Sequence, residues 1–257
     1  MRILFTNDDG VFAPGILALL EAFAAQGHIC YVCAPDQERS AASHSVTLGK
    51  PLHAKPVDIP GAARAWAVDG PPADCASLGL FLCRDAGIDL VISGINRGMN
   101  QGGACIYSGT VAAALEASMC GFQALAVSLC VTPGSGKTLA EYAAATRVAL
   151  RIAAWMADHP LPRGAIYNLN VPPLPYEQLR GIAPARLAPV FLDDPDYEEA
   201  ADEQGHGYLY RGVGPAKPLD DPEYDTFKTD QGFASLTKLT WDFRMNEDDA
   251  ELGEIGL

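Results

Sequence analysis

Short apolar runs alternate with helical segments over the first 185 residues, and this alternation constrains the fold more than any other feature. Continuous apolar runs, typical of strands buried on both faces, occur at residues 3–5, 28–34, 66–68, 89–94, 124–130 and 165–172. Helical patterns occupy residues 11–25, 73–83, 108–119 and 138–157, and residues 46–60 resemble a hairpin excursion. Because such alternation forms parallel sheets covered by helices, the sequence predicts an α/β fold. We expect a doubly wound, mostly parallel, Rossmann-like sheet in three αβα layers.

The pattern changes beyond about residue 185. Acidic, turn-rich stretches at 193–196 and 220–223 separate short β-like pieces at 207–211 and 233–241, and an acidic tail follows at 246–251. This predicts an α/β core over residues 1–185 and a β-rich C-terminal extension over residues 186–257. We expect the extension to reach toward a partner subunit and the tail to be a solvated end.

Composition restricts the class of partner. The 32 acidic and 18 basic residues give a net charge of −14, which argues against a nucleic-acid partner. No apolar stretch is long enough to cross a membrane, and the N-terminus leads straight into a strand, so we expect a cytoplasmic protein without a membrane partner. Seven cysteines scattered through apolar segments favour reduced thiols, and Cys30 and Cys33 are expected to be buried rather than redox-active.

Two adjacent carboxylates, Asp8 and Asp9, end the first predicted strand. Gly10 supplies the backbone freedom for a turn, which lets the two side chains converge. In open α/β sheets this carboxyl end is where ligands bind. Two like charges so close together favour a shared Mg²⁺, Mn²⁺ or Ca²⁺ ion, although an Asp-Gly pair also occurs in ordinary turns.

Three further polar segments follow predicted strands and are expected at the same edge of the sheet. They contain Arg39-Ser40, Ser93-Gly94-Ile95-Asn96, and Tyr107-Ser108-Gly109-Thr110, which begins a helix with Ser108 as a plausible N-cap. Carboxylate, hydroxyl and amide oxygens together form an all-oxygen site suited to hydrated Mg²⁺ or Mn²⁺. The glycines let backbone amides approach an anion beside that metal ion.

The chain resembles the SurE family, the survival protein 5′/3′-nucleotidases, over nearly all of residues 1–240. The segments that carry the resemblance are Asn7–Gly10, Ala34–Asp36 with Glu38–Ser40, Ser43–Leu48, Gly70–Cys75, Asp89–Asn96, Tyr107–Val111 and Asn168–Pro172. The resemblance implies one divalent metal ion per subunit, held by Asp8, Asp9, Ser40 and Asn96. It also implies hydrolysis of nucleoside monophosphates, in some members of short polyphosphate, by homodimers or homotetramers that exchange C-terminal segments.

From these observations we expect a metal-dependent phosphomonoesterase acting on nucleoside 5′-monophosphates, with 3′-monophosphates and short polyphosphate as further substrates. Asp8, Asp9 and Asn96 are the expected catalytic residues. The expected phosphate or substrate contacts are Asn7, Ser43, His44, Gly94, Ser108, Gly109 and Thr110. For His44, a surface imidazole without a catalytic role is an equal alternative.

Three residues depart from the family pattern: Ala41, Arg97 and Lys238. The first two are expected to adjust pocket shape or substrate preference, and the third concerns subunit exchange. Gly134-Ser135-Gly136-Lys137-Thr138 resembles a P-loop, but Val131 stands where that motif needs its first glycine, so we expect a surface loop. A non-catalytic, receiver-like signalling module is the alternative function. It would require an aspartate where the chain has Ser93-Gly94.

Overall fold

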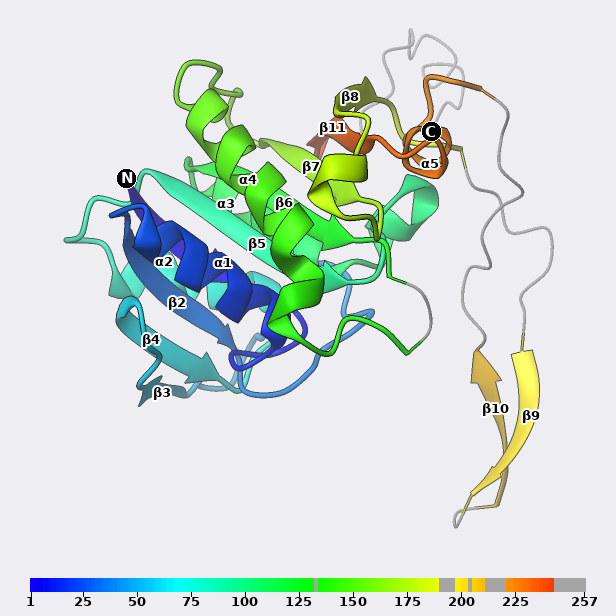
Figure 1. The fold of residues 1–257 in the computed structure, drawn as a ribbon. Coiled ribbons are helices and arrows are strands. Elements are labelled where there is room, and N and C mark those ends of the chain that lie inside the picture. The colour runs from blue at the N-terminus through cyan, green and yellow to red at the C-terminus, as the bar shows by residue number, and fades with distance from the viewer. Residues whose placement is uncertain (132–133, 190–196, 203–204, 211–220, 243–257) are drawn as a thin grey trace, which may run out of the picture.

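The computed structural model describes residues 1–131, 134–189, 197–202, 205–210 and 221–242. Within these ranges the main feature is a nine-stranded sheet with helices on both faces (Figure 1). Its strands are β1 (Arg2–Thr6), β2 (Ile29–Pro35), β3 (Ala54–Val57), β4 (Ala62–Val68), β5 (Leu90–Arg97), β6 (Gln123–Leu129), β7 (Ala165–Val171), β8 (Ile182–Ala185) and β11 (Ala234–Thr240). The helices are α1 (Pro14–Ala25), α2 (Pro72–Leu82), α3 (Gly109–Met119), α4 (Ala143–Met156) and α5 (Asp225–Asp230). Single turns of 3₁₀ helix form η1 (Gly102–Ile106), η2 (Leu139–Tyr142) and η3 (Tyr176–Gln178).

The sheet order is β3-β4-β2-β1-β5-β6-β7-β11-β8, and the six strands from β4 to β7 run parallel. β3 pairs antiparallel with β4, so a hairpin forms over residues 54–68. The hairpin expected within residues 46–60 is therefore displaced, because only β3 lies in that range. α1 and α4 cover one face of the sheet, and α2 and α3 cover the other (Figure 1). The predicted three-layer, doubly wound, mostly parallel fold is therefore confirmed.

β1 lies between β2 and β5 in the interior of the sheet. Its residues Ile3, Leu4 and Phe5 are completely buried, as expected of a strand covered on both faces. Leu4 is in register with Tyr31 of β2 on one side and with Val91 of β5 on the other. The chain thus leaves β1 toward β2 and later returns to β5 on the other side of β1. The crevice outside such a switch point is where doubly wound sheets bind ligands.

Two of the predicted boundaries that differ from the observed ones lie beside the expected site. The first helix begins at Pro14, not at residue 11, because a turn with Gly10 at φ +106° occupies the intervening residues and proline favours the first helical turn. β5 continues through Asn96 to Arg97, so the segment expected as a loop from residue 95 is partly strand. A register shift between Ser93 and Asn96 marks a bulge in its pairing with β6.

The C-terminal part of the chain contributes directly to the main sheet. β11 lies between β7 and β8, antiparallel to the former and parallel to the latter, and its Ser235 and Thr237 are buried. The division expected at residue 185 therefore does not coincide with an edge of the sheet. The expected strand near 207–211 is β10 (Gly205–Tyr210), which pairs antiparallel with β9 (Tyr197–Asp202). The acidic stretches at 193–196 and 246–251 lie outside the described residues.

All seven cysteines are free, and Cys30 and Cys33 are buried within β2. Burial raises the pKa of the Cys30 thiol to about 11 and that of Cys33 as well, so the expectation of inert thiols is confirmed. None of the described helices combines the length and the apolar character required to span a membrane.

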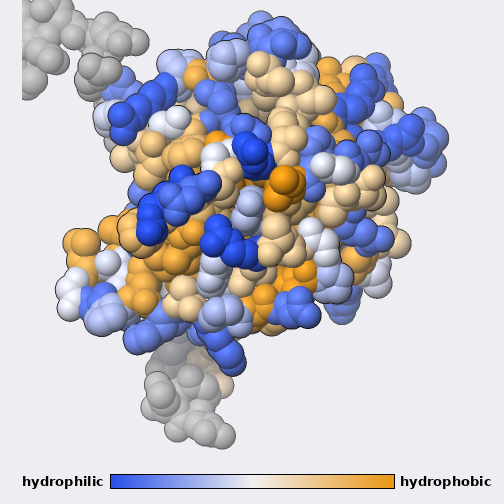
Figure 2. Space-filling model, turned by 90° about the vertical axis from the view of Figure 1, so that its left-hand side faces the viewer, coloured by the Kyte–Doolittle hydropathy of each residue, from blue (hydrophilic) through white to orange (hydrophobic). Residues whose placement is uncertain are grey.

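Figure 2 shows the side of the molecule where the N-terminus lies, with hydrophilic and hydrophobic residues interspersed across it. The arrows of β2 and β4 point away from that side in Figure 1. It therefore carries the amino ends of these strands, and their carboxyl ends, where a ligand is expected, lie at the opposite edge.

Candidate functional site

Three hydrogen bonds join segments that are far apart in the sequence at the carboxyl edge of the sheet. The backbone N–H of Arg39, in the loop after β2, donates to the Asp8 carbonyl at 2.7 Å. The backbone N–H of Arg97, at the end of β5, donates to Asp9 Oδ2 at 3.0 Å. Thr110 Oγ1, in the first turn of α3, donates to Asp8 Oδ1 at 2.6 Å. The predicted meeting of the four polar segments around Asp8 and Asp9 is thus observed.

Asp8 lies against the N-terminus of α3 and is only 4% exposed. Gly109 makes this approach possible, because a Cβ atom at that position would lie 2.8 Å from Pro72 Cγ and 3.0 Å from Asp8 Cβ. Burial raises the pKa of Asp8, and the hydrogen bond from Thr110 opposes this effect. The fold therefore holds a carboxylate where its charge is poorly solvated, an arrangement that a cation would stabilise.

Asp9 faces away from α3, toward the end of β5. Burial and the neighbouring Asp8 charge raise the pKa of Asp9 to about 6, and the hydrogen bond from the Arg97 backbone opposes the rise. The two aspartates thus have different supports, one from α3 and one from β5, although they are adjacent in the chain.

The turn that carries both aspartates is closed by Asn7. Its Nδ2 donates to the Gly10 carbonyl at 2.8 Å, and its Oδ1 accepts the Gly10 N–H at 3.2 Å. Asn7 is completely buried. The structure thus gives the Asn7 side chain a role in shaping the turn, and its expected contact with phosphate stays a prediction.

The other two expected metal ligands, Ser40 and Asn96, each donate one side-chain hydrogen bond to a protein acceptor. Ser40 Oγ donates to Glu38 Oε1 at 2.7 Å, and Asn96 Nδ2 donates to the Gly98 carbonyl at 3.0 Å. These bonds leave the side-chain oxygen of each residue available as an acceptor or metal ligand. Two carboxylates, a hydroxyl and an amide oxygen form the donor set that hard divalent cations prefer, so these residues fit Mg²⁺ or Mn²⁺.

This set differs from a conventional cluster of ionisable ligands. No group of three or more His, Cys, Asp or Glu side chains suited to a metal ion occurs in the described ranges. A site here would depend on the two aspartates together with neutral oxygens. Such a site has few protein ligands and leaves coordination positions for water or substrate, as Mg²⁺ sites commonly do.

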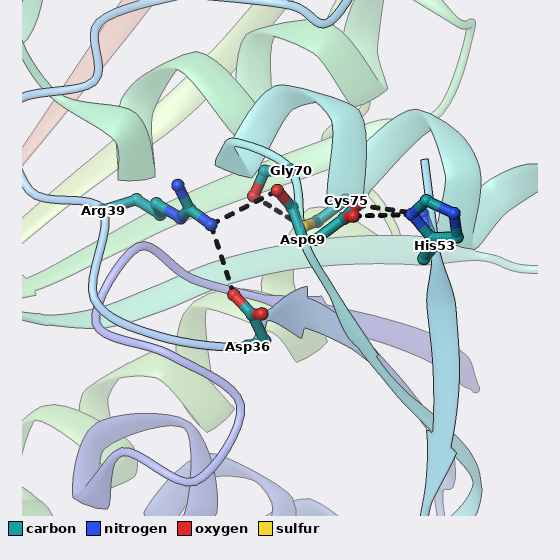
Figure 3. Close-up of polar contacts among 6 residues, drawn as sticks. All are labelled: Asp36, Arg39, His53, Asp69, Gly70 and Cys75. Atoms are coloured by element: carbon teal, nitrogen blue, oxygen red, sulfur yellow. Dashed lines mark hydrogen bonds and ion pairs between the residues drawn. The ribbon is translucent and has the colours of Figure 1, made fainter. Parts of the chain in front are cut away.

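Arg39 fixes the loop that carries Ser40 (Figure 3). Its guanidinium Nη2 lies 3.3 Å from Asp36 Oδ1 and donates to the Asp69 carbonyl at 3.2 Å. Asp69 is itself held by His53, whose backbone and side-chain hydrogen bonds lower the pKa of the Asp69 carboxyl. Arg39 therefore ties the loops after β2 and β4 together beside Asp8.

Ser43 contacts the segment that precedes α3, and His44 contacts α3 itself. Ser43 Oγ donates to the Ile106 carbonyl at 2.8 Å, and its N–H donates to the Tyr107 carbonyl at 3.0 Å. His44 Nε2 is 2.9 Å from Glu116 Oε2. With Ile106 and other residues of η1 and α3, both line a cavity of about 580 Å³. Their expected contacts with substrate stay a prediction.

The N-terminus of α3 is capped as expected, since Ser108 Oγ accepts the Val111 N–H at 3.0 Å. The segment that leads into this helix is fixed by Asn170, which accepts the Asn100 N–H at 2.8 Å and donates to the Asn100 carbonyl at 2.9 Å. Asn168 donates to the same carbonyl at 2.9 Å. This network gives the Asn168-Leu169-Asn170 segment a physical role that sequence reasoning did not supply.

The C-terminal part of the chain supports the same segment. Asp225, at the start of α5, is completely buried and accepts the Gly102 N–H at 2.9 Å. Gln101 Nε2 donates to the Asp225 carbonyl at 2.9 Å. Neither residue was expected to matter. The sequence offered no signal for this contact, because Asp225 follows the acidic stretch at 220–223 and lies more than 100 residues from Gly102.

Gly94 and Ser93 are buried in β5. Gly94 has φ +135°, and a Cβ atom there would collide with the Val127 carbonyl oxygen. Close backbone packing thus explains this glycine, and its expected approach to phosphate stays a prediction. Ser93 is completely buried, and its hydroxyl has no hydrogen-bond partner among the described residues. A buried serine therefore occupies the position where a receiver domain needs its phosphoryl-accepting aspartate.

The chain is similar to known proteins of one family. Residues 3–192 match the family described as survival protein SurE. The chain is 39% identical to the 5′-nucleotidase SurE of Geobacter metallireducens, with 95% of this chain and 98% of that protein covered. It is 41% identical to the 5′-nucleotidase SurE of Geobacter sulfurreducens, with 94% and 88% covered. The crystal structure of the SurE protein from Aquifex aeolicus superposes with a TM-score of 0.77 at 28% identity, covering 99% and 98% of the two chains.

Proposed function

The chain belongs to the survival protein SurE family, and we propose that it hydrolyses nucleoside 5′-monophosphates to nucleoside and phosphate with the help of one divalent metal ion. Its enzyme class, a 5′-nucleotidase, follows from relatives that are 39% and 41% identical over most of their lengths. The proposal therefore concerns the metal ion, the range of substrates and the residues that act.

The observation that carries the proposal is the anchoring of each expected ligand. One oxygen of Asp8 and one of Asp9 accept hydrogen bonds from Thr110 and Arg97. Ser40 and Asn96 donate to Glu38 and Gly98. These bonds orient the side chains and leave oxygen atoms free for a cation, as supporting hydrogen bonds around metal sites do. We propose that Mg²⁺ or Mn²⁺ binds there.

A bound metal ion would polarise a phosphoryl oxygen and lower the pKa of a coordinated water molecule. The protein would contribute mainly position and electrostatics, because the transition state of phosphoryl transfer carries diffuse charge. The N-terminus of α3, with Ser108, Gly109 and Thr110, would present backbone N–H groups to the phosphate oxygens.

We extend the proposal to 3′-monophosphates and short polyphosphate as further substrates, and to a homodimer or homotetramer that forms through residues 186–257. The N-terminus of α3 supports the first point, because its backbone N–H groups would recognise a phosphate group without contacting the base. The ribbon of β9 and β10 supports the second. Within the described ranges these strands pair with each other and not with the main sheet. The receiver-like alternative has no support, since Ser93 is not a phosphoryl acceptor of the required kind.

The test is phosphate release from nucleoside 5′- and 3′-monophosphates and tripolyphosphate with Mg²⁺, Mn²⁺ or Co²⁺, with and without EDTA. We expect hydrolysis of 5′-monophosphates that EDTA abolishes and excess Mn²⁺ restores. Full turnover in EDTA would refute the role of the metal ion. Absence of hydrolysis of every nucleoside monophosphate under all conditions would refute the proposed function itself.

A further inference from the structure

A second, smaller cavity of about 320 Å³ adjoins Asp9 on the side away from α3. It is lined by Asp9, Ala13, Pro14, Glu38, Arg97, Gly136, Lys137 and Tyr142. The segment around Lys137 is the P-loop-like sequence that was expected to be a surface loop without a role. The fold instead brings it beside one of the two central aspartates.

The P-loop-like segment does not act as a phosphate cradle, because the chain's own carboxylate occupies its amides. Glu141 accepts the N–H groups of Gly136, Lys137 and Thr138 at 2.7, 2.9 and 2.8 Å. The Thr138 hydroxyl donates to the same carboxylate at 2.8 Å. These bonds lower the pKa of Glu141 to about 2. The backbone of residues 136–138 is therefore fixed, and Lys137 projects from a rigid support.

Arg97 packs directly on this support. A Cβ atom at Gly136 would lie 2.7 Å from Arg97 Cγ and 3.0 Å from Arg97 Cδ, so the aliphatic part of Arg97 lies over the glycine backbone. Tyr142 is buried, and its hydroxyl donates a hydrogen bond to the Gly136 carbonyl at 3.0 Å. This bond further fixes the backbone of the segment. The Arg97 and Lys137 side chains consequently line one cavity from adjacent positions.

Arg97 and Lys137 are exposed residues, and the positive charge of Arg97 opposes the rise in the Asp9 pKa. The Arg97 guanidinium and the Lys137 ammonium form no hydrogen bond or ion pair with any residue that the structure describes. The cavity thus brings together two cationic side chains, Arg97 and Lys137, and two carboxylates, Asp9 and Glu38. A guanidinium group binds phosphate oxygens in a forked geometry, and an ammonium group adds a point charge.

We propose that Arg97 and Lys137 form a subsite for a second phosphate group of the substrate, which would make nucleoside bisphosphates preferred over monophosphates. This inference rests on the proposed function, in which the reacting phosphate lies between Asp8 and the N-terminus of α3. A substrate with phosphates at both ends of its ribose would place one at that helix and the other in the cavity beside Asp9. A volume of about 320 Å³ is ample for a phosphate group and several water molecules.

The test compares kcat/KM for adenosine 3′,5′-bisphosphate and AMP in the wild type, Lys137→Ala, Arg97→Ala and Lys55→Ala. Lys55 is an exposed residue of β3 outside the cavity, so its substitution makes the same change in charge as that of Lys137. We expect the ratio of bisphosphate to monophosphate kcat/KM to fall about tenfold in Lys137→Ala and in Arg97→Ala, as expected for loss of a charged hydrogen bond. The ratio in Lys55→Ala should equal that of the wild type.

An equal effect of Lys137→Ala on both substrates would overturn the subsite, while hydrolysis of AMP by the wild type would leave the proposed function intact. Failure of the wild type to hydrolyse either substrate would instead overturn the proposed function.

Inhibition of AMP hydrolysis by tripolyphosphate distinguishes the source of the second phosphate. If Lys137→Ala weakens inhibition by tripolyphosphate about tenfold, the subsite recognises a phosphate without the nucleoside. If Lys137→Ala lowers kcat/KM for the bisphosphate but leaves this inhibition unchanged, the nucleoside positions the second phosphate.

Discussion

The Thr110 hydroxyl donates a hydrogen bond of 2.6 Å to Asp8 Oδ1 across a separation of 102 residues. Both side chains are buried, Thr110 completely, so the bond is shielded from water. It fixes the orientation of the carboxylate and links the turn after β1 to the first turn of α3. These are the two elements that the proposed mechanism requires to act together.

Replacing Thr110 with valine keeps the shape of the side chain but removes the hydroxyl. A hydrogen bond to a charged group contributes about 1.5–3 kcal/mol, and Asp8 would lose its orientation along with it. We expect kcat/KM for AMP to fall roughly tenfold. Thr110→Ser keeps the hydroxyl and should retain most of the activity. Equal losses in the two variants would show that packing, rather than the hydrogen bond, explains the effect.

Replacing Asp8 with asparagine should separate activity from stability. We expect kcat to fall about 10²-fold, because a preorganised charge at the reacting phosphate is removed. The unfolding midpoint measured without metal should not decrease, since a neutral amide avoids the burial that raises the Asp8 pKa. Asp85→Asn, at an exposed turn, is the matched control and should change neither quantity. A near-normal kcat of Asp8→Asn in saturating Mn²⁺ would contradict the assigned role.

Arg39 is predicted to be a positioning residue for the metal site. Its side chain is 32% exposed, so the ion pair with Asp36 contributes at most about 1 kcal/mol to stability. The loop that carries Ser40 depends on it, and we expect Arg39→Ala to weaken Mn²⁺ binding about tenfold while leaving the unfolding midpoint nearly unchanged.

Isothermal titration with Mn²⁺ measures this effect. Arg84→Ala is the control, since Arg84 also donates to a backbone carbonyl, that of Phe81 at 3.2 Å, but lies outside the site. Arg39→Lys keeps the positive charge but replaces the planar guanidinium with a single ammonium group, so it should give an intermediate affinity. Unchanged Mn²⁺ affinity in Arg39→Ala would exclude the positioning role.

Glu141 gives a prediction about pH. Its pKa is lowered from 4.5 to about 2 by hydrogen bonds from the backbone of residues 136–138 and from Thr138. A lowered carboxyl pKa stabilises the folded state above pH 4.5, and this stabilisation is lost as the pH falls toward 2. We expect Glu141→Gln to unfold at a lower temperature than the wild type at pH 7. The difference should shrink by about half between pH 7 and pH 3.

Thermal unfolding followed by circular dichroism between pH 7 and pH 3 measures this difference. Glu177→Gln is the control, because the Glu177 carboxylate pairs with Arg147 at the surface instead of accepting the N–H groups of residues 136–138. A difference that is independent of pH would mean that the carboxylate charge of Glu141 does not hold the segment.

Much of the fold follows from local pattern in the sequence. Runs such as Ile3-Leu4-Phe5 are continuous and apolar because both faces of their strands are covered, and the helical segments show their own periodicity. The order of the polar segments after these strands predicted an oxygen-rich site at one edge of the sheet. Short elements of the C-terminal part, such as β8 and α5, were missed because few residues carry too little periodicity to identify them.

The sequence by itself determined the chemical groups of the site: adjacent carboxylates, a serine, an asparagine, and a glycine where a helix must approach closely. Tertiary structure alone decided which groups meet. It placed β5 beside β1 with a bulge before Asn96, inserted β11 between β7 and β8, and brought Lys137 to Arg97 beside Asp9. The physical reason is that periodicity reports only which faces of an element are buried. Strand neighbours and contacts between distant residues depend on how the whole chain packs.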